Sequence, residues 1–190
     1  MSVPGAGIGD VTIAIRPAAG GDVAAIDALL RTVFPRADEA DLVRQLCVDG
    51  DMVLMMVAVD ENADGDADGD GGALVGAVAF SRMAVEVGGK AIAAVALAPI
   101  AVAESYRRQG VAEALIQAGI ERIEAARVVL CFVLGEPAFY ARFGFHADYA
   151  KNFDSPYAGE HLMALPVQGG LMPCGARGAA AHAPAFARIG

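Results

Sequence analysis

The chain has 190 residues, a length typical of one domain with short extensions, which excludes a large multidomain enzyme. Hydrophobic residues make up 56% of the sequence and charged residues 19%, so the chain has enough apolar surface for a folded core and is not of the disordered class. Six acidic residues between positions 60 and 70 account for most of the net charge of −9 and leave −3 for the rest of the chain. No basic surface of the kind that binds nucleic acid is visible, and we predict no nucleic-acid partner.

The sequence carries no sign of a membrane segment, a signal peptide or a metal site. The longest uncharged apolar stretch, 91–103, contains Pro99 and is shorter than the roughly 20 residues of a spanning helix. No basic residue precedes Arg16, and the three cysteines are widely spaced. The acidic segment 64–70 begins like a calcium loop, but its twelfth position is Val75 instead of glutamate. We therefore predict a cytoplasmic protein with no membrane partner and no metal, and a solvated loop at the acidic segment.

Hydrophobic periodicity and turn residues predict a flexible tail at 1–10, one domain at 11–167 and a Gly/Ala/Pro-rich extension at 168–190 that packs on or near the domain. Apolar runs within the domain predict strands at 11–16, 52–59, 74–87, 91–102, 128–134 and, last, 161–166. Helical spacing predicts four helices: one at 22–33, one from 38 onward, one at 112–127 and one near 137–143. Asp22 is the predicted N-cap of the first helix. The order indicates an α/β (α+β) fold: a mixed, mostly antiparallel central sheet with helices on both faces, in which 91–134 is a parallel crossover unit.

The segment 102–112 joins a predicted buried strand to an amphipathic helix. A turn at Gly110 beside the small Ala112 lets backbone N–H groups converge at the helix N-terminus, where the helix dipole favours phosphate oxygens. Arg107 and Arg108 add positive charge there. The same residues also describe an ordinary strand-to-helix loop with exposed arginines, so both interpretations stay open on this segment alone.

Two motifs resemble one protein family. The segment Arg107-Arg108-Gln109-Gly110-Val111-Ala112 resembles the Q/R-x-x-G-x-G/A signature of the GNAT superfamily of N-acetyltransferases, in which this loop holds the pyrophosphate of acetyl-CoA. The segment 136–145 resembles the family's Y-x-x-x-G-F ending, with Phe139 where a second tyrosine is often found. The resemblance covers 13–145, and Pro156, Met163 and Pro184-Ala185-Phe186 are similar to the YhbS-type bacterial subgroup. It implies the GNAT-like acyl-CoA N-acyltransferase fold, with acetyl-CoA as cosubstrate bound by the loop residues Arg107, Arg108, Gln109, Gly110, Val111 and Ala112.

The resemblance also implies roles for Tyr140 and for the strand before the loop. Transfer of an acyl group from a thioester to an amine expels a thiolate, so it needs an N–H donor for the oxyanion and a proton source for sulfur. Tyr140 matches the position of the family's general acid, and a tyrosine with an ordinary pKa near ~10 is protonated at neutral pH. Main-chain groups of Ile100, Ala101 and Val102 are expected to hold the pantetheine arm, with an N–H near Val102 polarising the thioester carbonyl. Tyr140 also fits a core aromatic, because three phenylalanines surround it in the sequence.

The sequence identifies no general base. Glu86 and Glu136 are the carboxylates nearest the inferred site, and His146 and His161 could also accept a proton, but each fits an exposed or structural role as well. A water relay would leave no trace in the sequence. Cys131 lies in a predicted buried strand, which argues against an acetyl-cysteine intermediate.

The leading hypothesis is an acetyl-CoA-dependent N-acetyltransferase that acts on a small-molecule or peptide primary amine by direct transfer in a ternary complex. Two alternatives remain: a non-catalytic acyl-CoA-binding or sensing module of the same fold, and a structural subunit that oligomerises through the apolar extension. A homodimer is compatible with that extension. The acidic loop is a weak indication of a cationic acceptor.

Overall fold

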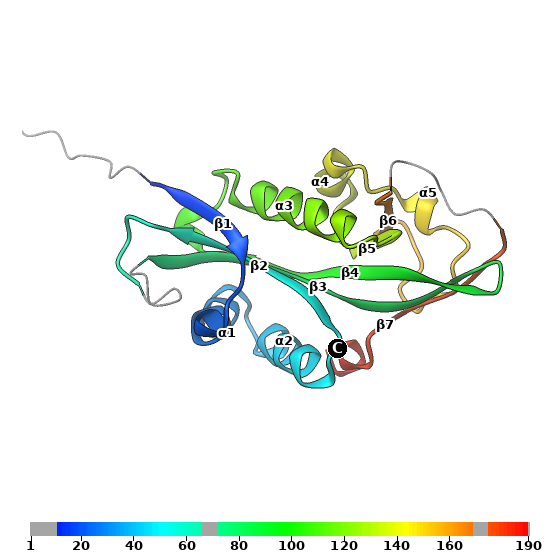
Figure 1. The fold of residues 1–190 in the computed structure, drawn as a ribbon, viewed down its shortest axis with the longest axis horizontal. Helices are drawn as coiled ribbons and strands as arrows, with labels where there is room; N and C mark the ends of the chain where they lie inside the picture. Colours follow the sequence, from blue (N-terminus) through cyan, green and yellow to red (C-terminus); the bar gives the residue numbers. More distant parts are fainter. Residues whose placement is uncertain (1–10, 66–71, 169–174, 190) are drawn as a thin grey trace, which may run out of the picture.

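The computed structural model describes residues 11–65, 72–168 and 175–189, so the predicted tail at 1–10 lies outside the described residues. Within these ranges, seven strands form one sheet in the order β1-β2-β3-β4-β5-β6, with β7 paired to β3 (Figure 1). The strands are β1 (Ile13–Pro17), β2 (Met52–Asp60), β3 (Ala73–Val87), β4 (Lys90–Val102), β5 (Leu130–Leu134), β6 (Leu162–Pro166) and β7 (Arg177–His182). The α-helices are α1 (Val23–Val33), α2 (Asp38–Asp49), α3 (Val111–Ala125), α4 (Pro137–Tyr140) and α5 (Ala147–Ala150). Single 3-10 turns are η1 (Gly20–Asp22), η2 (Glu104–Tyr106), η3 (Ala141–Phe143) and η4 (Pro184–Arg188).

The sheet is antiparallel except at one junction. Strands β4 and β5 are parallel, and α3 connects them. Every other pairing of the described sheet is antiparallel. Helices α3 and α4 cover one face of the sheet, and α1 and α2 cover the other (Figure 1). The predicted mixed, mostly antiparallel sheet with helices on both faces and a parallel unit over 91–134 is therefore confirmed.

Two apolar layers hold the helices to the sheet. On the α3 face, Leu115 and Ile116 pack with Phe80, and all three side chains are fully buried. Gly119 faces the same ring: a Cβ at this position would lie 2.4 Å from Phe80 ring carbons, so glycine sets how closely α3 approaches the sheet. On the other face, Leu30 of α1 and other apolar residues of α1 and α2 cover the buried alanines and valines of β2 and β3.

The prediction that 161–166 is the last strand is wrong, because β7 follows it and pairs with the far half of β3. Strand β3 begins to run beyond β2 after Ser81, and β7 takes the place of β2 along Met83–Val87. A segment rich in glycine and alanine has a low intrinsic preference for strand, so the free edge of β3, not the local sequence, accounts for β7. The turn η4 then packs its Phe186 and Ala185 against Leu42 and Leu46 of α2.

Asp22 stands at the predicted N-cap position of α1, but its side chain does not cap that helix. The buried carboxylate instead accepts two hydrogen bonds from the guanidinium of Arg16, at 2.6 and 3.0 Å, and one of 2.8 Å from the N–H of Ala19. Instead of capping the helix, Asp22 therefore forms an ion pair that joins β1 to the start of α1.

Replacing Asp22 by alanine is expected to lower the free energy of unfolding by about 3 kcal/mol, because the change removes the acceptor of a buried ion pair and of a backbone N–H. The Arg16 side chain is 32% exposed and regains part of its hydration, which places the loss at the lower end of the range for buried pairs. Urea denaturation measures this change. Asp49→Ala, an exposed residue at the end of α2, is the control and should alter stability by less than about 0.5 kcal/mol. Similar values for the two variants would contradict the assignment.

Candidate functional site

Strands β4 and β5 separate part-way along their length. Their ladder joins only Ala94–Ala96 to Leu130–Phe132, although β4 runs on to Val102 and β5 to Leu134. A bulge begins at the same point, because Leu97 and Ile100 of β4 face Phe80 and Val78 of β3 with an extra residue between them. Beyond Ala96, the β5 side of β4 therefore has no strand partner within the described sheet, and the peptide groups on that side that carry no other hydrogen bond are available to a bound molecule.

The predicted phosphate loop lies at the end of β4. Gly110 is the N-cap of α3 and adopts a left-handed conformation with φ +82°, and Arg108 is also left-handed at φ 59°. The first N–H groups of α3 have no acceptor within the helix and point toward the loop. Arg107 Nε donates to Val102 O at 3.2 Å, and Gln109 Nε2 donates to Ser105 O at 2.7 Å. The loop thus combines a helix N-terminus, two exposed cations and internal hydrogen bonds that fix its shape.

One acidic residue of the segment 60–70 belongs to this region instead of to a solvated loop. Asp60 ends β2, is 4% exposed and accepts a hydrogen bond of 2.9 Å from the hydroxyl of Tyr106 in η2. This bond raises the pKa of Tyr106. Asp60 therefore anchors the turn before the predicted phosphate loop, while Asp66, Asp68 and Asp70 lie outside the described residues.

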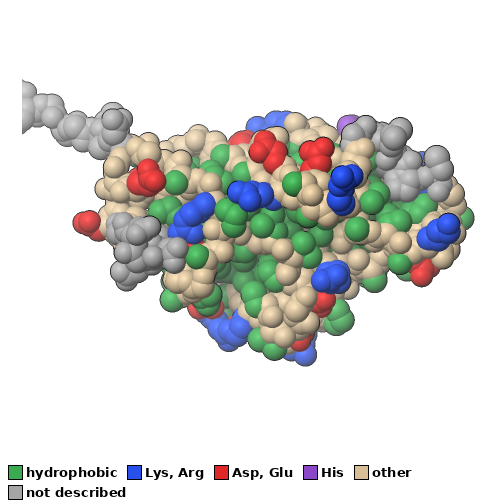
Figure 2. Space-filling model, in the orientation of Figure 1, with side chains coloured by type: hydrophobic (Ala, Val, Ile, Leu, Met, Phe, Trp, Pro, Cys, Tyr) green, Lys and Arg blue, Asp and Glu red, His purple; other side chains and the backbone are tan. Residues whose placement is uncertain are grey.

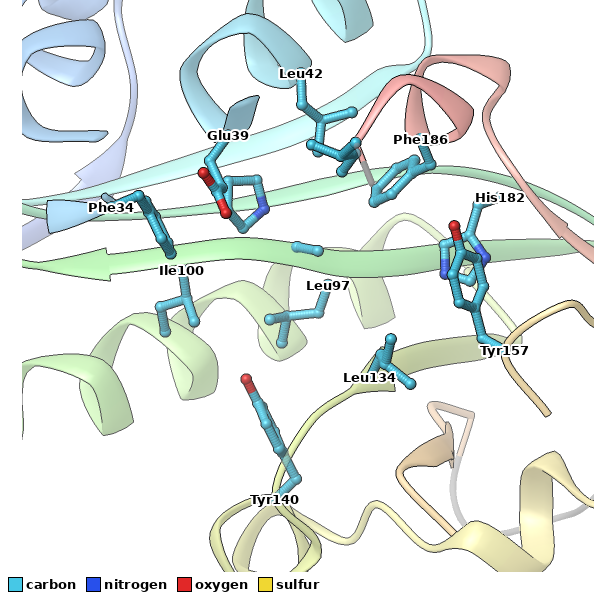
Figure 3. Close-up of a pocket in the computed structure, with 13 residues that line it drawn as sticks. Phe34, Glu39, Leu42, Leu97, Ile100, Leu134, Tyr140, Tyr157, His182 and Phe186 are labelled. Carbon is cyan, nitrogen blue, oxygen red and sulfur yellow. The ribbon is translucent and has the colours of Figure 1, made fainter. Parts of the chain in front are cut away.

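Tyr140 ends α4 and is 8% exposed. Its ring packs edge-on against Phe139 and Phe145, with centroids 5.0 and 5.9 Å away. A Cβ on Gly135 would lie 2.5 Å from the Tyr140 ring, so the glycine makes room for it. Burial, with the nearby Cys131, raises the pKa of the Tyr140 hydroxyl, which points toward β4 (Figure 3). The ring is a core aromatic and the hydroxyl faces a cavity.

That cavity has a volume of about 370 Å³ and lies between the predicted site residues Ile100 and Tyr140 and the α1 and α2 layer (Figure 3). In Figure 2, hydrophobic side chains gather in the middle of the molecule's visible face, between the α3 and α4 layer and the α1 and α2 layer. Of the predicted site residues, only Ile100 and Tyr140 line the cavity. The remaining lining residues are Phe34, Glu39, Leu42, Leu97, Ala98, Pro99, Leu134, Tyr157, His182, Phe186 and Ile189.

The four side chains considered as bases lie elsewhere. Glu86 and Glu136 are exposed on β3 and at the start of α4. His146 is exposed beside Tyr149, and the exposed ring of His161 lies 3.2 Å from Gly135 O. None of the four lines the cavity. Cys131 is fully buried, and burial raises the pKa of its thiol, so its thiolate is disfavoured.

Glu39, Tyr157 and His182 are the polar cavity residues that sequence reasoning missed. Glu39 is one of three acids in the first turn of α2, and no local signal distinguishes it from the other two. His182 ends β7, in the extension that the sequence left without assigned structure. Its ring lies 5.0 Å from those of Tyr157 and Phe186, and its buried Nδ1 has no hydrogen-bond partner among the described residues.

Burial lowers the pKa of His182 below its ordinary value of 6.5, so the folded state favours the neutral imidazole. The unfolded chain therefore binds more protons just below pH 6.5, and the stability gained from neutral His182 is lost as the pH falls through that region. We expect the free energy of unfolding to fall less steeply between about pH 7 and about pH 5 in His182→Gln than in the wild type. Urea denaturation at a series of pH values measures the slope. His146→Gln, an exposed control, should keep the wild-type slope, and an unchanged slope in His182→Gln would contradict the shift.

Comparison with known proteins agrees with the fold. The family model of the acetyltransferase (GNAT) domain matches residues 14–147. The chain belongs to the GNAT family. The Escherichia coli K12 protein "Uncharacterized N-acetyltransferase YhbS" is 41% identical over 124 residues, which cover 65% of this GNAT chain and 68% of YhbS. The predicted family resemblance is therefore confirmed.

Solved structures extend the match to nearly the whole chain. The crystal structure of E. coli YhbS in complex with CoA has a TM-score of 0.76 and 30% identity, and the match covers 100% of this GNAT chain and 97% of that one. A GNAT acetyltransferase from Brucella melitensis, solved with acetyl-CoA, has a TM-score of 0.67 at 24% identity, covering 92% and 98% of the two chains. The second match shows a shared fold. In the described part of the chain, no helix is long and apolar enough to cross a membrane, and no cluster of three His, Cys, Asp or Glu residues could hold a metal ion.

Proposed function

We propose that this GNAT chain transfers the acetyl group of acetyl-CoA to a primary amine by direct attack of the amine in a ternary complex. The observation that carries the proposal is the arrangement along β4. The ladder with β5 ends at Ala96, the strand continues to the phosphate loop, and Tyr140 lines a cavity with Leu97 and Ile100. The presence of CoA in the E. coli YhbS structure supports the same assignment.

The residues at the end of β4 fit an acyl-CoA molecule. The N-terminus of α3, with Arg107 and Arg108, would hold the pyrophosphate through backbone N–H groups and positive charge, and Gly110 permits the left-handed turn that opens the helix. Gln109, Val111 and Ala112 complete this loop. Main-chain groups of the segment Ile100, Ala101 and Val102, along the β4 edge that β5 leaves open, would hydrogen-bond the pantetheine arm.

Tyr140 is assigned as the group that donates a proton to the leaving sulfur. Bound acetyl-CoA supplies the acyl group as a thioester. A backbone N–H near Val102 would polarise the thioester carbonyl while the amine nitrogen forms the new C–N bond and the C–S bond breaks. The raised pKa of Tyr140 keeps its hydroxyl protonated at neutral pH, so it can donate to the developing thiolate. The amine loses one proton to water or to a base, and the CoA sulfur gains one.

The two described cysteines support the remaining parts of the proposal. Cys131 is enclosed and its thiolate is disfavoured, which supports direct transfer over an acetyl-cysteine intermediate. Both cysteines that the structure describes, Cys47 and Cys131, are free, as expected for the reducing cytoplasm.

Initial-velocity kinetics test the proposal. Release of the CoA thiol is followed while acetyl-CoA and a primary amine are both varied, over a panel of amines. Direct transfer predicts thiol release that requires the amine and double-reciprocal lines that intersect. Parallel lines would contradict a ternary complex. Acetyl-CoA binding without release with any amine would support the non-catalytic binding module.

A further inference from the structure

The end of the cavity on the α2 side of β4 is lined by apolar side chains and one carboxylate (Figure 3). In Figure 3, Glu39, Leu42 and Phe186 lie on the opposite side of β4 from Tyr140. Phe34, the C-cap residue of α1, also faces this end of the cavity (Figure 3). A volume of about 370 Å³ falls within the range of small-molecule sites, roughly 300–1,000 Å³. This end is shaped for a small apolar group.

The carboxylate of Glu39 differs from those beside it. Asp38 forms an ion pair with Arg36, and Asp41 contacts both Arg31 and Arg44. Glu39 has no hydrogen bond or ion pair with any described residue, and it is half-buried where it lines the cavity. An acid in the first turn of a helix is favoured by the helix dipole, which explains the three acids but not why one of them faces an apolar cavity without a partner. A half-buried carboxylate of this kind favours a cationic ligand.

The charges around the cavity restrict that ligand further. Among the described residues, the lining contains one carboxylate and no lysine or arginine. His182 at the far end is neutral at pH 7, because burial lowers its pKa. The described lining can therefore neutralise one positive charge and offers no cation to a carboxylate.

We infer that the acceptor of this GNAT enzyme is a hydrophobic primary monoamine, whose ammonium group contacts Glu39 and whose apolar body packs on Phe34, Leu42 and Phe186. This inference rests on the proposed function, and it names the class of amine. The ammonium releases one proton to water, and its nitrogen then attacks the thioester carbonyl from the Glu39 side of β4, while Tyr140 on the other side protonates the leaving sulfur (Figure 3). Glu39 is then a residue that recognises the acceptor's charge.

Other amine classes fit the cavity less well. A free amino acid brings a carboxylate that finds no cation in the lining, and a polyamine or an aminoglycoside brings several ammonium groups for one glutamate. None of the described residues of the acidic segment 60–70 lines the cavity. Asp60 accepts a hydrogen bond from Tyr106.

Calorimetric titration of 2-phenylethylamine into the CoA-saturated protein tests the inference without requiring turnover. The wild type should bind 2-phenylethylamine at least about tenfold more tightly than phenylalanine or spermidine. Glu39→Gln, which keeps the shape and removes the charge, should raise the Kd for 2-phenylethylamine by about tenfold or more and leave the Kd for CoA unchanged. Asp41→Asn is the matched control, because it removes one charge from the same helix turn outside the cavity, and its Kd should stay within about twofold of the wild type.

The outcomes separate this inference from the proposed function. Absence of 2-phenylethylamine binding, tighter binding of spermidine or phenylalanine, or an unchanged Kd in Glu39→Gln would each overturn the inference. If acetyl transfer to another class of amine is then observed, the proposed function stands and only the acceptor class is wrong. Glu39-dependent binding without any acetyl transfer would uphold the acceptor site and contradict the proposed reaction.

Discussion

The double variant Arg107→Glu, Gly110→Glu is expected to raise the Kd for acetyl-CoA at least about 100-fold, a free-energy change near 3 kcal/mol. A glutamate at Gly110 must adopt φ +82°, which costs roughly 1–2 kcal/mol for a residue with a Cβ. The two new carboxylates also face the site proposed for the pyrophosphate, and the change removes the Arg107 hydrogen bond to Val102. Isothermal titration of acetyl-CoA measures the loss.

The control for this variant carries the same chemical changes elsewhere. Arg127→Glu, Gly50→Glu reverses a charge at the opposite end of α3 and places a glutamate at φ 75°, at the C-cap of α2. We expect this protein to bind acetyl-CoA within about threefold of the wild type, since exposed charges far from the site interact weakly through water. Equal losses in the two double variants would mean that destabilisation, and not the loop, weakens binding.

Tyr140→Phe is expected to lower kcat by about 100-fold or more, with the KM for acetyl-CoA changed by less than about threefold. The substitution keeps the ring contacts with Phe139 and Phe145, so the fold should survive. Because the pKa of Tyr140 is raised above its ordinary value, the wild type should lose activity only at strongly alkaline pH, where the phenol ionises. Up to about pH 10 this group should therefore cause no decline in kcat, in the wild type or in the variant. Steady-state kinetics from about pH 6 to about pH 10 measure the loss of kcat in Tyr140→Phe across that range.

Tyr149→Phe is the matched control for the hydroxyl. Tyr149 packs against His146 on α5 and does not line the cavity, so its kcat should stay within about twofold of the wild type. A kcat in Tyr140→Phe that equals the wild-type value across the pH range would remove Tyr140 from the chemistry and leave it as a core aromatic.

The order of elements and the loop before α3 could be predicted because both depend on local signals. A buried strand, a glycine that permits a left-handed turn and an apolar stripe with helical spacing are contiguous in 91–127. The ring and the hydroxyl of Tyr140 show the limit of such signals. The sequence offered a core aromatic or an acid as alternatives, but one side chain is buried through its ring and faces the cavity through its oxygen.

The acceptor side of the cavity could not be predicted, because tertiary contacts decide which residues face it. Three acids begin α2, and only the positions of Arg31, Arg36 and Arg44 determine that Glu39 is the one without a partner. His182 reaches the cavity because β7 pairs with the part of β3 that extends past β2. A tail of glycine and alanine carries no periodic signal for that pairing.

Mass spectrometry of a reaction with acetyl-CoA labelled isotopically in its acetyl group tests the central claim most directly. The wild type is incubated with labelled acetyl-CoA and 2-phenylethylamine, and the amide product, the free CoA thiol and the intact protein are measured together. The account predicts label in the amide, one thiol released for each amide formed and no label retained on the protein. Thiol release without a labelled amide, or label held on the protein, would contradict direct transfer to an amine.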